Sequence, residues 1–180
     1  MRAVEPIRNK DDIERMRNYL KQRNERNYIM FVLGVSLGLR ISDLLQLKKE
    51  DLLSTHIDLK EIKTTKAKRL KIPGYIKKDI LPYAYTLTDG DYVLKSREGV
   101  NKAIDRTTAY RILKQAADDL RLKNIGTHSL RKTFGYHYYQ DTKDIATLQE
   151  LFNHSDQRIT LKYIGVEQDE LDRAMERFRI

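Results

Sequence analysis

Apolar residues recur at helical spacing near the start of the chain. Ile13, Met16 and Leu20 follow one another at intervals of three and four residues, which places them on one face of a helix. Asp11 or Asp12, just before this stripe, can accept a hydrogen bond from a free backbone N–H of the first turn. The pattern predicts one helix within the first twenty-five residues.

The next segment, NYIMFVLGVSLGL (27–39), has the opposite character. Apolar residues occupy nearly every face of the helix that it would form, so the segment predicts a central helix buried on all sides. After Arg40, the residues ISDLLQL indicate a short helix that begins at Ser42 or Asp43.

The pattern changes from helical to strand-like spacing at 56–73. The residues HIDLKEI alternate with period two, and RLKIP follows after a lysine-rich turn, which predicts a small β-hairpin. From Tyr75 the chain is mostly helical, and helices are predicted at 74–87, 107–122, 128–140, 144–151, 155–162 and 167–178. We therefore expect a mainly α fold with one small antiparallel β-hairpin (α+β).

Composition narrows the class of protein. The 180 residues, the size of one domain, include 35 Lys and Arg against 26 Asp and Glu, a net charge of +9. Such an excess favours a polyanionic partner, with nucleic acid first, although a solubilising surface gives the same count. The absence of cysteine excludes disulfides, thiolate metal sites and a cysteine nucleophile. No leader peptide and no membrane-spanning segment is evident, so we expect a soluble cytoplasmic protein.

Two arginines stand where an anion could bind. His128 and Arg131 are three residues apart and share a helix face near the N-terminal end, which favours anions. Arg40 follows the wholly apolar helix, and an arginine at the edge of a core must be paired or hold an anion. Each motif has an ordinary alternative. His128 and Arg131 are then only a surface histidine beside an arginine, and Arg40 only forms a structural ion pair with Asp43.

Two other segments carry candidate chemistry. KEIKTTKAKRLKIP (60–73) is either a solvated charged turn or a mobile basic finger that reaches a phosphate. In LFNHSDQRITLKYIG (151–165), His154 lies nine residues before Tyr163, and the two would be about half a turn apart on a continuous helix. Ser155 or Asp156 as an N-cap would start a new short helix between the two and let them converge. Otherwise Tyr163 is a packing tyrosine.

The order of these elements resembles the tyrosine recombinases of the phage integrase family. GLRISDLLQL is similar to the first arginine box of the family, and THSLRKTFGYHYY to its H-x-x-R box. LFNHSDQRITLKYI is similar to the final box, with the His-to-Tyr spacing intact. The resemblance covers the catalytic domain from about residue 10 to about residue 175.

The chain departs from the family pattern at a few positions. Asn153 stands where glycine is usual, and asparagine tolerates the left-handed backbone better than most residues. Lys132 replaces a histidine and Asp43 replaces a glutamate. Lys63 best matches the Lys-Thr pattern of the hairpin, with Lys66 as runner-up. Residues 1–180 are expected to form a single catalytic domain without the N-terminal DNA-clamping domain, in either a naturally short member or a piece of a longer protein.

The resemblance implies metal-free phosphoryl transfer to Tyr163, with a 3′-phosphotyrosyl intermediate. Arg40, Arg131 and His154 would stabilise the charge on the non-bridging oxygens. Lys63 would protonate the leaving 5′-oxygen and His128 would serve as general acid or base.

The function expected from this resemblance is site-specific recombination or integration in a bacterial or phage-encoded, nucleoid-associated enzyme. Its partners would be double-stranded DNA and further copies of the chain, as a tetramer on paired sites, and it would need no cofactor, metal or ATP. The alternatives are a type IB topoisomerase-like enzyme and an inactive DNA-binding regulator. A metal-dependent nuclease is disfavoured, because the carboxylates form no ligand cluster in the sequence.

Overall fold

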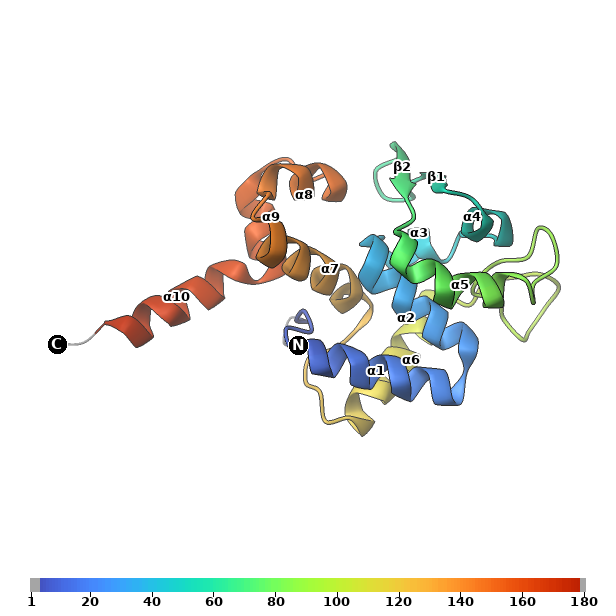
Figure 1. Cartoon of the computed structure of the whole chain (residues 1–180), viewed down its shortest axis with the longest axis horizontal. Helices are drawn as coiled ribbons and strands as arrows, with labels where there is room; N and C mark the ends of the chain where they lie inside the picture. The colour runs from blue at the N-terminus through green and yellow to red at the C-terminus, as the bar shows by residue number, and fades with distance from the viewer. Residues whose placement is uncertain (1–3, 179–180) are drawn as a thin grey trace.

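A computed structural model describes residues 4–178, with the backbone alone at residues 168, 170, 171, 173 and 174. The described chain is a helical body with one hairpin at its edge and one helix that projects away from it (Figure 1). The elements are α1 (Lys10–Arg23), α2 (Glu25–Leu37), α3 (Ile41–Leu44), α4 (Lys49–Leu53), β1 (His56–Lys60), β2 (Ala67–Lys71), η1 (Gly74–Ile76), α5 (Lys77–Ala84), α6 (Arg106–Asp119), α7 (Thr127–Thr142), α8 (Ile145–Phe152), α9 (Gln157–Ile164) and α10 (Val166–Arg177).

Helix α2 is the centre of the fold, which confirms the prediction of a buried helix. Nine of its residues are buried, and α1, α5 and α7 pack against it. Asn24 caps its N-terminus, and Gly38 ends it with φ of 60°. A side chain at Gly38 would collide with Phe134 of α7, so α2 and α7 approach closely just before Arg40.

The predicted starts of α1 and α3 are wrong by a few residues. Asn9 caps α1, because its extended backbone lets the side chain accept from the N–H of Asp11. The two aspartates lie instead in the first turn, where their charge complements the helix dipole. Helix α3 begins at Ile41, directly after Arg40.

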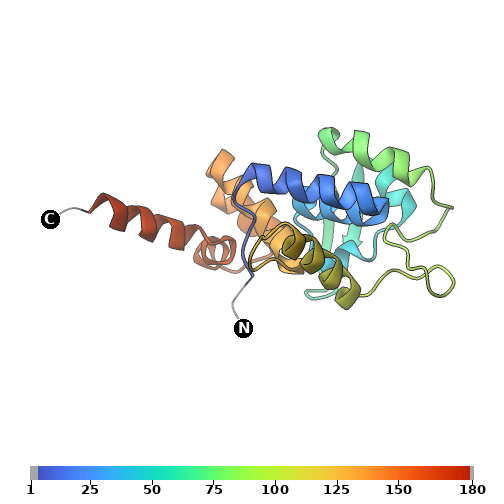
Figure 2. The ribbon, with the colours of Figure 1, turned by 90° about the horizontal axis from the view of Figure 1, so that it is seen from below.

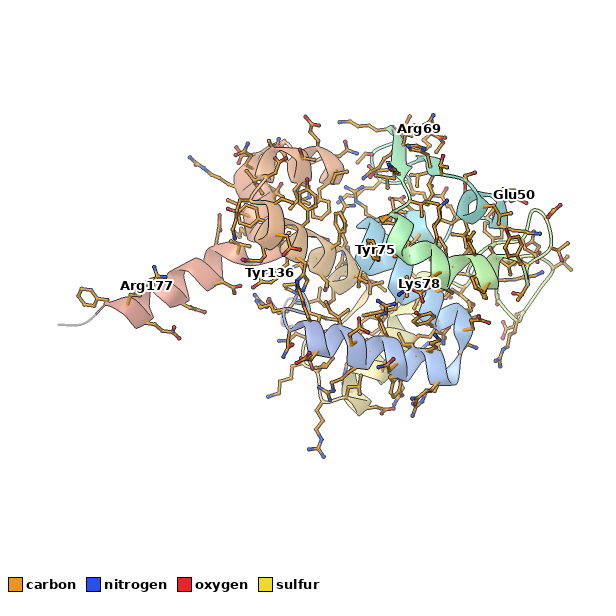
Figure 3. All side chains as sticks on the ribbon, in the orientation of Figure 1. Glu50, Arg69, Tyr75, Lys78, Tyr136 and Arg177 are labelled. Carbon is orange, nitrogen blue, oxygen red and sulfur yellow. The ribbon has the colours of Figure 1, made fainter. Side chains whose placement is uncertain are left out.

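The hairpin forms as predicted. Strands β1 and β2 pair antiparallel, with His56 opposite Lys71 and Lys60 opposite Ala67. Ile57 and Leu70 face the core, and Arg69 points outward from the hairpin (Figure 3). The turn between the strands therefore lies at the edge of the helical body.

The C-terminal helices form a second, smaller apolar cluster on α7. Phe152, Ile164 and Val166 are buried there against Tyr136. Beyond this cluster α10 extends away from the body in both ribbon views (Figures 1 and 2). Within residues 4–178, no helix is long and apolar enough to cross a membrane.

Gly135 permits the close contact between α7 and the helices α8 and α9. A Cβ atom there would lie 2.7 Å from Ile164 and 2.8 Å from Phe152. We therefore expect Gly135→Val to lower the free energy of unfolding by about 2 kcal/mol, or the melting temperature by about 4–8 °C. Gly74→Val is the control, because no atom lies within 4 Å of a Cβ at Gly74. Equal melting temperatures for the two variants would contradict the packing described here.

Candidate active site

The C-terminal end of α8 gathers three cationic side chains. The Phe152 carbonyl accepts a hydrogen bond from Arg40 Nη2 at 3.3 Å and another from Arg131 Nη2 at 2.9 Å. The preceding carbonyl, of Leu151, accepts from Lys68 Nζ. The last carbonyls of a helix have no intrahelical partner and carry the negative end of its dipole. The end of α8 therefore orients two guanidiniums and one ammonium toward the same place.

Arg131 is the most enclosed of the three. Its side chain is 2% exposed, its Nη1 donates to the Gly38 carbonyl at 2.6 Å, and its guanidinium lies 4.1 Å from the centre of the Phe152 ring. Burial, and then the charge of Arg40, lower the pKa of Arg131 to about 10. The group remains charged at neutral pH, in a site where positive charge is in excess.

Arg40 has a nearer carboxylate partner than the sequence suggested. The Oε1 atom of Glu61 lies 2.9 Å from Arg40 Nη1, whereas Asp43 Oδ2 lies 4.0 Å away. Asp43 is fully buried and instead accepts from the backbone N–H of Ile62. The ion pair with Asp43 is thus secondary.

Tyr163 and His154 come together as the predicted break between them requires. Asp156 caps α9, and the imidazole and phenol ring centres lie 5.4 Å apart. Phe152 contacts both rings edge-on. The Nδ1 atom of His154 lies 3.0 Å from Thr160 Oγ1, which orients the imidazole.

The protonation of these two groups reflects the same positive field. Burial raises the pKa of Tyr163, while the charges of Arg131 and Arg40 oppose that rise. Burial, followed by the charges of the same two arginines, lowers the pKa of His154 to about 4. Without an anion in the site, the phenol is protonated and the imidazole neutral at pH 7.

Lys63 and His128 line a hollow beside this cluster. Its volume is about 1320 Å³, and Arg40 and Arg106 also line it. Burial, and then the charges of Lys132 and Arg131, lower the pKa of His128. Lys63 and the runner-up Lys66 are both exposed in the hairpin turn. Of the two, Lys63 is among the described residues that line the hollow, and Lys66 is not.

Sequence reasoning missed Lys68 and Glu61. Lys68 lies two residues before the core residue Leu70 on β2. Because side chains two apart in a strand point to the same face, the sequence did place Lys68 on the inner face. Its side chain is 9% exposed, and burial, then the charge of Arg131, lower its pKa to about 8. Glu61 directly follows β1 and is 1% exposed. Period two puts it on the same face as Ile57 and Leu59, but a glutamate is rarely buried without partners, and the sequence does not show those partners.

The arrangement suits a tetrahedral oxyanion next to a phenol. Two guanidiniums, an imidazole and a phenolic oxygen lie around one helix end, and fixed donors of this kind stabilise charge that develops during phosphoryl or acyl transfer. Among residues 4–178 with described side chains, no three His, Asp or Glu groups cluster as metal ligands would.

Comparisons with known proteins identify relatives of this chain. The chain is 44% identical over 170 residues to the probable integrase/recombinase YoeC of Bacillus subtilis (strain 168), covering 94% of this chain and 93% of YoeC. The chain also matches curated tyrosine recombinases of the XerA and XerC types. It spans 50% to 64% of the length of these relatives.

Two solved structures share the fold. The XerA recombinase superposes with a TM-score of 0.78 at 20% identity, over 100% of this chain and 68% of that one. The XerH site-specific recombinase, bound to a palindromic difH substrate, gives a TM-score of 0.75 at 20% identity, over 98% of this chain and 54% of its own.

The resemblance noted in the three sequence boxes is confirmed by a family model. The model of the phage integrase family matches residues 8–170. This range includes the candidate site residues Arg40, His128, Arg131, His154 and Tyr163. The chain therefore belongs to the phage integrase family.

Proposed function

We propose that this chain is a DNA strand-transferase that performs site-specific recombination through a 3′-phosphotyrosyl intermediate. The observation that carries the proposal is the convergence of Arg40 and Arg131 on the Phe152 carbonyl, beside the paired rings of His154 and Tyr163. Membership of the phage integrase family and the 44% identity to a probable integrase/recombinase support it.

The reaction is an in-line displacement at phosphorus. The phenolic oxygen of Tyr163 loses its proton and forms a bond to phosphorus, while the bond from phosphorus to the 5′-oxygen breaks. Arg40 and Arg131 donate to the non-bridging oxygens, where negative charge develops, and His154 adds a further hydrogen bond. A bound phosphate also neutralises the positive field of the site, which raises the proton affinity of His154 and favours its donor form.

The leaving 5′-oxygen needs a proton, and the hairpin carries three lysines that could donate it. We assign this role to Lys63, which lines the hollow with His128 and Arg40, and keep Lys66 as the alternative. Lys68 is a third candidate, because its lowered pKa of about 8 allows it to exchange a proton near neutral pH. We assign to His128 the role of general acid or base, which takes up the proton that Tyr163 loses.

Double-stranded DNA is the proposed partner. The net charge of +9 favours a polyanion, and the hollow of about 1320 Å³ is lined by Lys63, Lys102 and Arg106 on the side of the candidate site. The XerH site-specific recombinase, which shares this fold, was solved bound to a palindromic difH substrate. Strand rejoining would need no ATP, because the phosphotyrosyl ester keeps the energy of the phosphodiester bond. The guanidiniums would supply the fixed positive charge that a metal supplies in other phosphoryl-transfer enzymes.

A covalent-trapping experiment tests the proposal. A duplex selected from a random library by binding supplies the site, and a nick near the cleavage point lets the released fragment diffuse away. We expect an adduct that resists boiling in detergent, forms in EDTA without ATP, and joins DNA to Tyr163. Tyr163→Phe removes one oxygen and keeps the ring, so folding and DNA affinity should be unchanged while the adduct disappears.

Other outcomes of this experiment have clear meanings. An adduct that persists in Tyr163→Phe and maps to Tyr138 or Tyr139 would overturn the assignment of the nucleophile. Tight binding without any adduct would make the chain a regulator. Nicking and resealing without strand exchange would make it a type IB topoisomerase-like enzyme. Cleavage that stops in EDTA would show that a metal is required.

We also propose that the chain assembles with further copies on paired DNA sites, as a tetramer. Two large apolar side chains are exposed at the end of α10 and directly after it, Met175 at 72% and Phe178 at 68%. Val166, the first residue of α10, is buried in the second cluster of its own chain and is not part of this exposed end. Arg8 pairs with Asp169 and anchors the first turns of α10.

The double variant Met175→Ser/Phe178→Ser tests this assembly. It leaves the anchor of α10 in place and removes only its exposed apolar end. We expect unchanged binding to a single site and a loss of paired-site complexes, measured by gel shift and by light scattering. The control is Tyr85→Ser, which removes another exposed aromatic side chain, 71% exposed, far from α10 in the chain. Full formation of paired complexes by the double variant would refute the role of this end.

A further inference from the structure

A single buried carboxylate joins four side chains next to the candidate site. Glu61 Oε1 lies 2.9 Å from Arg40 Nη1 and 3.6 Å from Lys68 Nζ. Its Oε2 accepts from Thr64 Oγ1 at 2.6 Å and from Asn153 Nδ2 at 2.8 Å. We call these five residues the Glu61 hub. Burial alone would raise the pKa of Glu61, but the two hydrogen bonds and the two cations lower it to about 2, so the hub is charged at working pH.

The hub connects three segments that are far apart in the sequence. Arg40 precedes α3, Lys68 lies on β2, and Asn153 lies between α8 and α9. Each segment carries a candidate site residue. Arg40 is one itself, Lys63 adjoins Thr64 in the hairpin turn, and His154 follows Asn153 directly. The placement of the hairpin is thereby linked to the placement of the loop that leads to Tyr163.

Asn153 meets two requirements at once. Its backbone is left-handed, with φ of 51° and ψ of 42°, and this conformation lets its own N–H and that of His154 bond the carbonyls of α8. Glycine, usual at this position in the family, also adopts that conformation but has no side chain to donate. The bond to Glu61 is therefore a property of this chain that the backbone does not require.

We propose that Glu61 and Asn153 are positioning residues for strand cleavage, and that their hydrogen bond latches the His154 loop to Arg40 and the hairpin. This inference rests on the proposed function. Arg40 has a long side chain, and its held orientation toward the phosphate requires a fixed partner. Glu61 provides that partner on one side, and the Phe152 carbonyl provides it on the other. The hydrogen bond from Asn153 to Glu61 fixes the positions of these two partners relative to each other, because Asn153 directly follows Phe152.

A bland alternative is that the hub only stabilises the fold. Breaking a buried ion pair by removing one partner is strongly destabilising whatever its catalytic role. The two readings differ in one observable quantity. A positioning role changes the rate of cleavage by folded protein on saturating DNA, whereas a purely structural role changes only the melting temperature.

The experiment measures single-turnover cleavage of the nicked duplex, DNA affinity and melting temperature for a small set of variants. Asn153→Gly removes the latch and keeps the backbone conformation, and Asn153→Asp puts a carboxylate against Glu61. We expect cleavage at saturating DNA to slow on the order of 10-fold in the first and more in the second. DNA affinity should be nearly unchanged in the first and weaker in the second, which adds a negative charge. Asn124→Gly is the matched control, because Asn124 is exposed and has φ of 58°. It should cleave at the wild-type rate.

A swap of the two groups provides the sharpest test. In Asn153→Asp/Glu61→Gln, the amide and the carboxylate exchange places, so the hydrogen bond can form again with the same total charge. We expect the double variant to cleave faster than Asn153→Asp alone, since residues that share an interaction are not additive. Glu61→Gln alone should bind DNA at least as tightly as wild type, because a negative charge leaves the site, and yet cleave more slowly.

Three outcomes would overturn the proposal. The first is wild-type cleavage by Asn153→Gly. The second is a double variant that is no faster than Asn153→Asp. The third is a set of rate losses that vanish at temperatures well below each melting transition. Failure of the proposed function itself is distinguishable, because in that case the wild-type protein forms no adduct.

Discussion

The end of helix α8 is the constraint on which the candidate site depends. Its last two carbonyls accept from Lys68, Arg40 and Arg131, which come from the hairpin, the end of α2 and α7. These three side chains converge because unpaired helix carbonyls attract cationic donors and because Asn153 turns the chain away in the left-handed conformation. The same turn leads directly to His154 and, through α9, to Tyr163. One helix terminus thus sets the positions of the cations, the imidazole and the phenol.

This convergence has an electrostatic cost that a bound phosphate would relieve. Arg131 and Lys68 have lowered pKa values, of about 10 and about 8, with burial as the first cause and a neighbouring arginine as the second. Glu61 and Asp43 supply buried negative charge, but the site remains rich in cations. A site that is held together against its own repulsion is preorganised for an anion, because little reorganisation is needed when negative charge develops. The family assignment gives this anion an identity, a DNA phosphate, as the proposed function states.

The sequence predicted the parts of the site that depend on local spacing. The buried helix α2, the hairpin and the break at Asp156 all follow from periodicity and capping, and so does the encounter of His154 with Tyr163. Glu61 escaped prediction because a buried glutamate needs partners, and its partners Arg40, Lys68 and Asn153 are distant from it in the sequence or known only from the fold. Lys68 was overlooked although it shares a strand face with the core residue Leu70. The reason is that the lysines in and around the turn were all expected to be exposed to solvent. The chemical roles of all six site residues remain predictions: Arg40, Lys63, His128, Arg131, His154 and Tyr163.

The central claim is that the arginines act on negative charge that develops at a phosphate, and a neutral substrate tests it most directly. A methylphosphonate at the cleavage position replaces one charged non-bridging oxygen by a methyl group, so it needs less positive charge around it. The measurement compares cleavage rates of wild-type protein and Arg40→Ala on both substrates. The account predicts a loss of at least about 10²-fold on the phosphate substrate and a much smaller loss on the methylphosphonate. Equal losses on the two substrates would contradict it, since Arg40 would then support the fold rather than the developing charge.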